Sequence, residues 1–213
     1  MNACEWLHRS LETLTVTRWP FDVQDLPRNG IYFFYEDGET WGHGDGQPRI
    51  VRIGTHRDGN FRSRISDHFL CKPEREICLI SRSVPHVRSI FRKHIGRALL
   101  NRPNDDYRQI WELDFTTRKS RAEHSHRRDV NREQAIEDEV TFTLREKFTF
   151  RYIEVELQRD RMGSAGLEPA LIGTLASCRL CTASASWLGR HSPQSISCEI
   201  ADCGWSNIYL PAR

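Results

Sequence analysis

The chain has 213 residues, of which 38% are hydrophobic, and this suffices for the core of a single domain with an elaboration. Mean hydropathy is −0.61, and no apolar run approaches the ~20 residues that span a bilayer, which argues against a membrane protein. The N-terminal sequence MNACEWLHRSLE lacks the apolar segment of a signal peptide, so we expect a cytoplasmic protein.

The net charge is only +2, but the basic residues are 27 arginines and 4 lysines. Arginine matches phosphate oxygens in bidentate geometry, although a genome rich in G and C would produce the same bias. Residues 82–128 carry a net charge of +7, and the rest of the chain carries −5. A basic segment in an otherwise acidic chain is typical of a protein that binds a polyanion.

The first half of the chain predicts a helix followed by a hairpin. Residues 6–14 have the apolar spacing of a short helix. Two apolar and aromatic runs, 30–35 and 50–54, flank a stretch rich in Gly and Asp at 37–48. This pattern is that of a β-hairpin with a long connection.

A helix carrying polar side chains of catalytic type follows the hairpin. Phe61, Ile65 and Phe69 recur every four residues and predict one apolar face of a helix over residues 61–70. Arg64 and His68 are also four residues apart and lie beside that face. A strand tyrosine, a strand that ends in Ile-Gly and a helix with Arg and His form a candidate site for phosphate chemistry.

The middle of the chain is less regular. Residues 71–83 indicate irregular structure with a short strand at 76–80, and residues 86–100 have the periodicity of a helix. Residues 110–115 alternate as in a strand, and residues 116–129 are polar enough for an exposed loop. The other face of the expected helix carries a basic set, Arg88, Arg92, Lys93 and Arg97.

The last third predicts a helix over 131–147, a third strand over 148–157 and a helix over 167–176. The tail, residues 177–213, is rich in Ser, Cys and Gly and has no clean periodicity.

Several short motifs occur together in order. Gly30-Ile31-Tyr32 and Arg52-Ile53-Gly54 lie on the two expected strands, Arg64-x-x-x-His68 follows on the helix, and Leu167-Glu168 opens the late helix. Their order and spacing resemble those of the GIY-YIG nuclease superfamily, and the Arg-x-x-x-His variant is similar to some restriction-enzyme branches.

This resemblance implies an α/β fold with a small, largely antiparallel three-stranded sheet flanked by helices. The core would comprise about 27–70 and 148–176, with a helical basic insertion at about 82–128 and a Cys-rich tail at 177–213, all within a single domain of residues 1–213.

The resemblance also implies roles for individual residues. Tyr32 would activate water, Arg64 would bind the scissile phosphate, His68 would transfer a proton, and Glu168 would hold Mg²⁺. Asn207 is the candidate for the asparagine that family members often have near the end of the core.

Structural explanations remain open for the same residues. A strand tyrosine is commonly a core residue, His68 fits a core or surface histidine, and Glu168 near a helix start fits the helix dipole. If the helix register is different, Arg62 takes the place of Arg64.

Arg52 stands where the family usually has its second tyrosine. Either it is a cation that helps to ionise Tyr32 or binds phosphate, or it is a surface residue between the inward-facing Val51 and Ile53. The substitution raises the alternative that the site is inactive.

The seven cysteines are odd in number, which argues against a disulfide framework in a cytoplasmic protein. Cys178-x₂-Cys181 and Cys198-x₄-Cys203 have the spacing of a four-thiolate zinc site. The alternative is that these are buried or free thiols.

The hypothesis is therefore a metal-dependent endonuclease that hydrolyses DNA, with RNA not excluded and a homodimer possible. The basic set on the middle helix would follow the DNA backbone, or it is an ordinary solvated helix face. The two rivals are a catalytically inactive nucleic-acid-binding protein with a nuclease-like fold, and a zinc-stabilised interaction module.

Overall fold

A computed structural model describes residues 1–71, 85–115 and 117–192. One antiparallel sheet has the order β1-β4-β2-β3 and consists of β1 (Thr17–Arg18), β2 (Ile31–Thr40), β3 (Pro48–Thr55) and β4 (Phe148–Ile153). The helices of these ranges are α1 (Ala3–Glu12), α2 (Phe61–Phe69), α3 (Pro85–Arg88), α4 (Ile90–Asn101), α5 (Arg108–Trp111), α6 (Arg118–His124), α7 (Val130–Lys147), α8 (Gln158–Arg161) and α9 (Leu167–Ala176). Short 3₁₀ helices are η1 (Val23–Asp25), η3 (Ser125–Arg127) and η4 (Leu188–His191).

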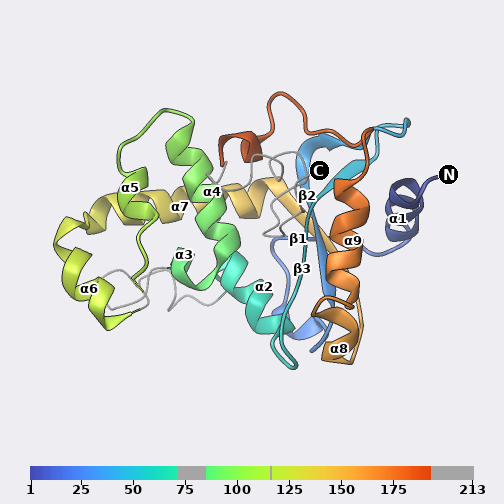
Figure 1. The fold of residues 1–213 in the computed structure, drawn as a ribbon, viewed down its shortest axis with the longest axis horizontal. Coiled ribbons are helices and arrows are strands. Elements are labelled where there is room, and N and C mark those ends of the chain that lie inside the picture. The colour runs from blue at the N-terminus through green and yellow to red at the C-terminus, as the bar shows by residue number, and fades with distance from the viewer. Residues whose placement is uncertain (72–84, 116, 193–213) are drawn as a thin grey trace.

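The predicted fold class is confirmed, because a small antiparallel sheet is flanked by helices (Figure 1). The three expected strands are present, and the two-residue β1 adds a fourth beside β4. β2 continues through the acidic stretch that was expected to be loop, so only residues 41–47 connect the hairpin. Within the described ranges, no helix is long and apolar enough to cross a membrane.

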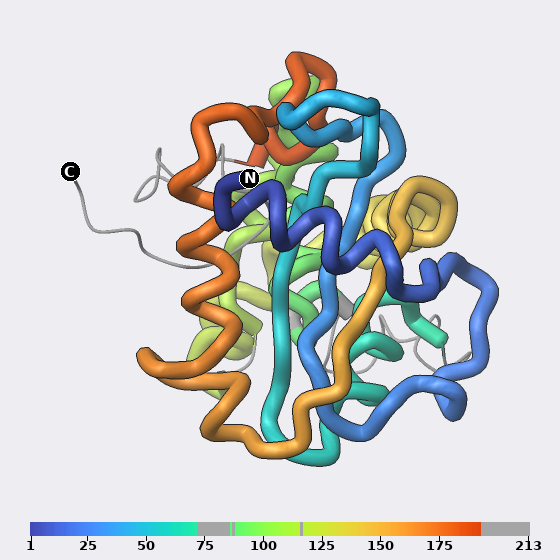
Figure 2. Tube along the Cα trace, turned by 90° about the vertical axis from the view of Figure 1, so that its right-hand side faces the viewer, coloured from blue at the N-terminus to red at the C-terminus, as the bar shows by residue number. Residues whose placement is uncertain are grey.

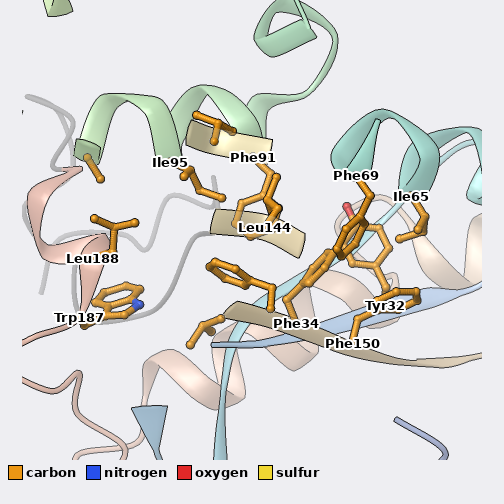
Figure 3. Packing of buried hydrophobic residues seen from close by; sticks show 14 of the residues in the cluster. Tyr32, Phe34, Ile65, Phe69, Phe91, Ile95, Leu144, Phe150, Trp187 and Leu188 are labelled. Carbon is orange, nitrogen blue, oxygen red and sulfur yellow. The ribbon is translucent and has the colours of Figure 1, made fainter. Parts of the chain in front are cut away.

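Apolar residues pack on both faces of the sheet. Figure 2 looks onto the strands, with α1 crossing in front of them. Tyr32 and Phe34 pack toward α2, α4 and α7, in the cluster drawn in Figure 3. Ile31, Phe33 and Tyr35 pack toward α1 and α9. This alternation is the ordinary period of a strand, and it confirms that Tyr35 faces away from Tyr32. A fully buried aromatic side chain contributes roughly 1.5–3 kcal/mol to such a core.

A bulge in β3 decides where Arg52 points. The ladder pairs Arg52 with Phe34 and then skips Val51, so β3 has one extra residue there. Val51 therefore packs in the Tyr32 layer while Ile53 packs in the opposite one. Arg52 is only 6% exposed, so the alternative that placed it on the surface is wrong.

The helix expected over 86–100 is interrupted at Ser89. The backbone of Ser89 is extended (φ −128°, ψ 101°), and its hydroxyl accepts a hydrogen bond from the Arg92 N–H at 3.2 Å. Ser89 is thus the N-cap of α4, a role that serine fills well because its oxygen satisfies a free N–H of the first turn. α3 ends one residue earlier, at Arg88.

Two further predictions for the middle of the chain are wrong. The stretch expected as a strand begins within the helical turn α5, where Trp111 is buried and donates its indole N–H to the Lys93 carbonyl at 2.9 Å. The stretch expected as an exposed loop contains α6, which Thr117 caps by accepting the Ser120 N–H. The polar composition of this stretch indicates that it is exposed, but it does not determine whether the backbone is helical or irregular.

Arg92 lies inside the protein, in contrast to the exposed basic face expected for this helix. It is 0% exposed and pairs with Glu137 of α7 at 2.6 Å. Its guanidinium also donates to the carbonyl of His68 at 3.0 Å and to Thr141 Oγ1 at 2.8 Å. Arg92 therefore joins α2, α4 and α7, and it is not available to a nucleic-acid backbone.

Arg97 is likewise buried and forms an ion pair with Glu112. The Lys93 ammonium donates to the Glu112 carbonyl at 2.9 Å and is half-buried. Arg88 alone of the four predicted backbone-binding residues is exposed. Most of the basic set therefore stabilises the packing of α4.

We expect Arg92→Met to lower the free energy of unfolding by about 3–5 kcal/mol, because it leaves the buried Glu137 carboxylate without its guanidinium partner. Urea unfolding followed by circular dichroism measures the change. Arg88→Met, an exposed arginine one turn earlier, is the matched control and should change stability by less than about 0.5 kcal/mol. Equal effects of the two substitutions would contradict the assignment.

Candidate active site

Tyr32 lies on β2 directly opposite Gly54 of β3. A Cβ atom at position 54 would lie 2.3 Å from the Tyr32 hydroxyl oxygen, closer than any side chain tolerates. Glycine at this position therefore makes the space in which the phenol ring lies. The close approach of the Tyr32 ring explains why the second motif ends in glycine.

His68 makes a polar contact with the Tyr32 hydroxyl. His68 Nε2 lies 3.2 Å from Tyr32 Oη, and His68 Nδ1 lies 2.7 Å from Ser89 Oγ. His68 and Tyr32 are 0% and 1% exposed. The break between α3 and α4 thus places a serine hydroxyl against the far nitrogen of the imidazole.

Burial lowers the pKa of His68 well below its ordinary 6.5, and the positive charges of Arg64, Arg52 and Arg92 lower it further. The imidazole is therefore neutral at pH 7, with one nitrogen a donor and the other an acceptor. In the tautomer that has Nδ1–H, this N–H donates to Ser89 Oγ and Nε2 is the acceptor that faces the phenol.

The two helix arginines point to different places. Arg64 donates from Nη1 to the Arg88 carbonyl at 2.9 Å, and its charge acts on His68. Arg62 instead donates to the Leu26 carbonyl at 2.6 Å, in the segment between η1 and β2. The geometry thus favours Arg64 over Arg62 as the arginine of the site.

Arg52 lies between the sheet and α4, with its guanidinium carbon 4.8 Å from the centre of the Phe91 ring. Burial lowers the pKa of Arg52 below its usual range, while the neighbouring Tyr32 and Glu168 counteract this. Of the two interpretations of Arg52, the structure thus supports a cation beside the tyrosine.

Glu168 occupies the first turn of α9, and its Oε1 accepts the Thr55 N–H at 3.1 Å. Burial raises the pKa of Glu168, while the Thr55 hydrogen bond, Arg52 and Arg64 oppose the rise. α9 and the end of β3 thus bring this carboxylate to the two arginines.

The donor set fits a magnesium ion better than a transition metal. Among the described residues, no group of three His, Cys, Asp or Glu side chains gathers at Glu168. Mg²⁺ commonly takes one or two carboxylates and fills its other positions with water and substrate phosphate. A carboxylate that gives one oxygen to a backbone N–H retains lone pairs for such a cation.

Two residues of this site escaped the sequence analysis. Ser89 was assigned to a helix interior, although a serine before an apolar helical run is a capping signal. His56 follows β3 and is half-buried, and its pKa is lowered by burial and by Arg64 and Arg57. Its place two residues after Gly54 was the available signal.

The remaining predicted residues lie elsewhere or outside the description. Asn207, Cys198 and Cys203 lie outside the described residues. Cys178 and Cys181 are far along the chain from Tyr32 and follow the last turn of α9.

A comparison of the sequence with models of protein families identifies the family of this chain. The model of the GIY-YIG domain matches residues 9–208. The chain belongs to the GIY-YIG family. No curated protein and no solved structure matches it.

GIY-YIG domains are generally those of endonucleases, and GIY-YIG nucleases are metal-dependent, so the family suggests a nuclease that acts on nucleic acid. In this GIY-YIG protein the first half of the motif is complete at Gly30-Ile31-Tyr32. The second half reads Arg52-Ile53-Gly54, and its glycine retains the close contact with the Tyr32 ring.

We expect the His68 imidazole to stay neutral as the pH falls through 6.5, because burial and three arginines oppose its protonation. The unfolded chain takes up this proton below 6.5, so His68 makes the protein less stable as the pH decreases. Nitrogen NMR of labelled histidine measures both the protonation and the tautomer. A His68 midpoint at or above that of the urea-unfolded protein would contradict this assignment.

Proposed function

We propose that this protein is a metal-dependent endonuclease that hydrolyses phosphodiester bonds of DNA. The observation that supports it best is the hydrogen-bonded line from Tyr32 through His68 to Ser89, with Arg64 and Glu168 beside it. The site combines a proton acceptor, a cation for phosphate and a carboxylate for a metal, which are the parts that phosphodiester hydrolysis requires.

In this proposal Tyr32 and His68 handle the proton of the attacking water. An O–H bond of the water breaks as Tyr32 Oη takes the proton, and the phenol passes its own proton to His68 Nε2. Ser89 holds Nδ1 and keeps Nε2 turned toward the phenol. Because the arginines disfavour an imidazolium, His68 carries the proton briefly, and the leaving oxygen receives it after its bond to phosphorus breaks.

Arg64 is the proposed phosphate-binding residue. One of its nitrogens is held by the Arg88 carbonyl, and a guanidinium has five N–H donors, so others remain for phosphate oxygens. The buried Arg52 adds positive charge next to Tyr32, where a phenolate would form. Arg52 then substitutes electrostatically for the motif tyrosine.

Glu168 is the proposed metal ligand. A bound Mg²⁺ there supplies positive charge that neutralises the phosphate as it reacts. Thr55 orients the carboxylate through its backbone N–H. Because β3 is an edge strand, Glu168 at its end is close enough to Arg52 and Arg64 for their charges to act on its carboxyl.

The proposed substrate is DNA. We also propose that residues 1–213 form a single domain. Cleavage of both DNA strands requires either two active sites, as in a homodimer, or two successive binding events by one active site. The homodimer stays a prediction.

A plasmid-nicking assay with Mg²⁺ tests the proposal. We expect wild type to nick DNA and Tyr32→Phe to be slower by roughly 10²–10⁴-fold, the usual contribution of a general base. Tyr35→Phe removes a hydroxyl from the opposite face of the same strand and should retain wild-type activity. Equal rates in Tyr32→Phe and wild type would contradict the role of the phenol.

The metal role has its own test. We expect Glu168→Gln to lose Mg²⁺-dependent nicking while it still binds plasmid in a gel-shift assay, because the amide removes a charged oxygen ligand. Glu154→Gln, at an exposed position after β4, is the control and should cut normally. Mg²⁺-dependent cleavage by Glu168→Gln at the wild-type rate would exclude this carboxylate as the ligand.

Arg52 in place of the motif tyrosine favours a second candidate, a nucleic-acid-binding protein without catalysis. Wild type would then bind plasmid but never cut it, over several metals and pH values, and Arg52→Tyr would be the variant that gains cleavage. Under the endonuclease proposal, wild type cuts and Arg52→Met loses most of the activity while it retains its fold.

A further inference from the structure

Four side chains with metal-binding chemistry meet away from the proposed active site. They come from the first turn of α1, the β2–β3 connection and the segment after α9, and they are Cys4, His43, Cys178 and Cys181. One ligand atom from each lies within 4.8 Å of all the others. In Figure 2 the N-terminus, the hairpin connection and the chain after α9 lie together at one end of the sheet.

The separations between ligand atoms fit a tetrahedral zinc shell. Cys4 Sγ lies 3.6 Å from Cys181 Sγ, and Cys178 Sγ lies 3.3 Å from His43 Nε2. Four ligands at zinc bond lengths of about 2.3 Å for sulfur and 2.0–2.1 Å for nitrogen stand about 3.5–3.8 Å apart. The four cysteines in the described ranges are free thiols, so no disulfide occupies this cluster.

The hairpin connection is built to present His43. Trp41 donates its indole N–H to the Gly44 carbonyl at 2.6 Å and to Asp45 Oδ1 at 2.7 Å, which closes the turn that contains His43. The Trp41 and His43 rings are in edge contact, with centres 5.2 Å apart. These contacts define the turn from which His43 reaches the three cysteines.

Gly42 joins the hairpin to the cysteine segment. A Cβ at Gly42 would lie 1.7 Å from the Leu180 carbonyl oxygen, so only glycine allows these two backbones to meet. The Gly42 N–H in turn points at Cys181 Sγ, at 3.5 Å. A backbone N–H directed at a cysteine sulfur is the kind of contact that stabilises a metal-bound thiolate.

The nearby His8 is not part of the set, because both of its nitrogens are used. Its Nδ1 lies 2.9 Å from the Cys4 carbonyl, and its Nε2 lies 3.2 Å from the Ile50 N–H. His8 therefore positions the backbone of α1 at Cys4 without binding the metal.

We infer that Cys4, His43, Cys178 and Cys181 form a structural zinc site. Three thiolates and one imidazole in a tetrahedral arrangement are the donor set that zinc prefers, and hard cations such as Mg²⁺ are disfavoured. Four protein ligands leave no position for water or substrate, which distinguishes a structural site from a catalytic one. Cys198 and Cys203 are not needed to complete the shell.

The zinc ion links the first turn of α1, the hairpin connection and the segment after α9 at a place where the local apolar cluster is small. Around it, the buried apolar residues among those described are Cys4, Trp41 and Cys181, a small cluster. Cys178 and Cys181 follow the end of α9, and Glu168 lies in its first turn. The metal therefore anchors one end of the helix whose other end carries the proposed catalytic carboxylate, about 15 Å along a ten-residue helix.

Metal analysis of the purified full-length chain tests the inference. We expect one zinc per chain by mass spectrometry, and, after exchange, the visible spectrum of tetrahedral Co²⁺ with thiolate ligands. Cys4→Ser and His43→Ala should each lower the zinc content at least several-fold. Cys71→Ser, a cysteine outside the cluster, and the double variant Cys198→Ser with Cys203→Ser should retain it.

His43→Cys keeps the inference testable if the other variants do not fold. It should retain one metal and change the Co²⁺ spectrum to that of a four-thiolate site. Wild type that binds neither zinc nor Co²⁺ would overturn the inference, as would zinc that survives Cys4→Ser but is lost from the double variant. Glu168→Gln should keep its zinc, so failure of the zinc site and failure of the nuclease proposal are separate results.

Discussion

The buried ion pair of Arg92 and Glu137 is the constraint on which the rest of this fold depends. Glu137 is almost fully buried; burial would raise the pKa of its carboxyl, but Arg92 and His86 outweigh this and lower it to about 2. The Arg92 guanidinium also holds the carbonyl of His68, so the last turn of α2 is tied to α4 and α7. Replacing such a pair by apolar residues is often harmless, whereas breaking it is costly, so its value here lies in fixing the position of His68.

The site built on this constraint has a buried part and a half-exposed part. Tyr32 and His68 lie deep, where burial and positive charge keep the imidazole neutral. Arg64, His56 and Glu168 are half-buried. This arrangement separates the groups that would handle a proton from those that would contact phosphate and metal. The inferred zinc site lies at the far end of α9, so it and the proposed magnesium site differ in task and in ligand chemistry.

Sequence patterns predicted the parts of the fold that depend on local spacing. The hairpin with Tyr32 and Gly54, the helix with Arg64 and His68, and the helix that begins before Glu168 all follow from periodicity and motif order. The structure brings these residues together. What local patterns could not reveal are partners distant in the chain. Arg92 looked like a surface arginine because its partner, 45 residues later, does not affect the helical pattern. The Cys-x₂-Cys pair was visible, but Cys4 and His43 join it only in the folded chain.

The most direct measurement replaces Tyr32 with a fluorinated tyrosine, which has the same shape and a more acidic hydroxyl. The pH dependence of plasmid nicking in Mg²⁺ is then compared with that of the natural protein. If Tyr32 must lose its proton for water attack, the rise of the rate with pH moves to lower pH in the fluorinated protein. A pH profile that is unchanged by the substitution would contradict the central claim that the Tyr32 hydroxyl, held by His68, takes part in the chemistry.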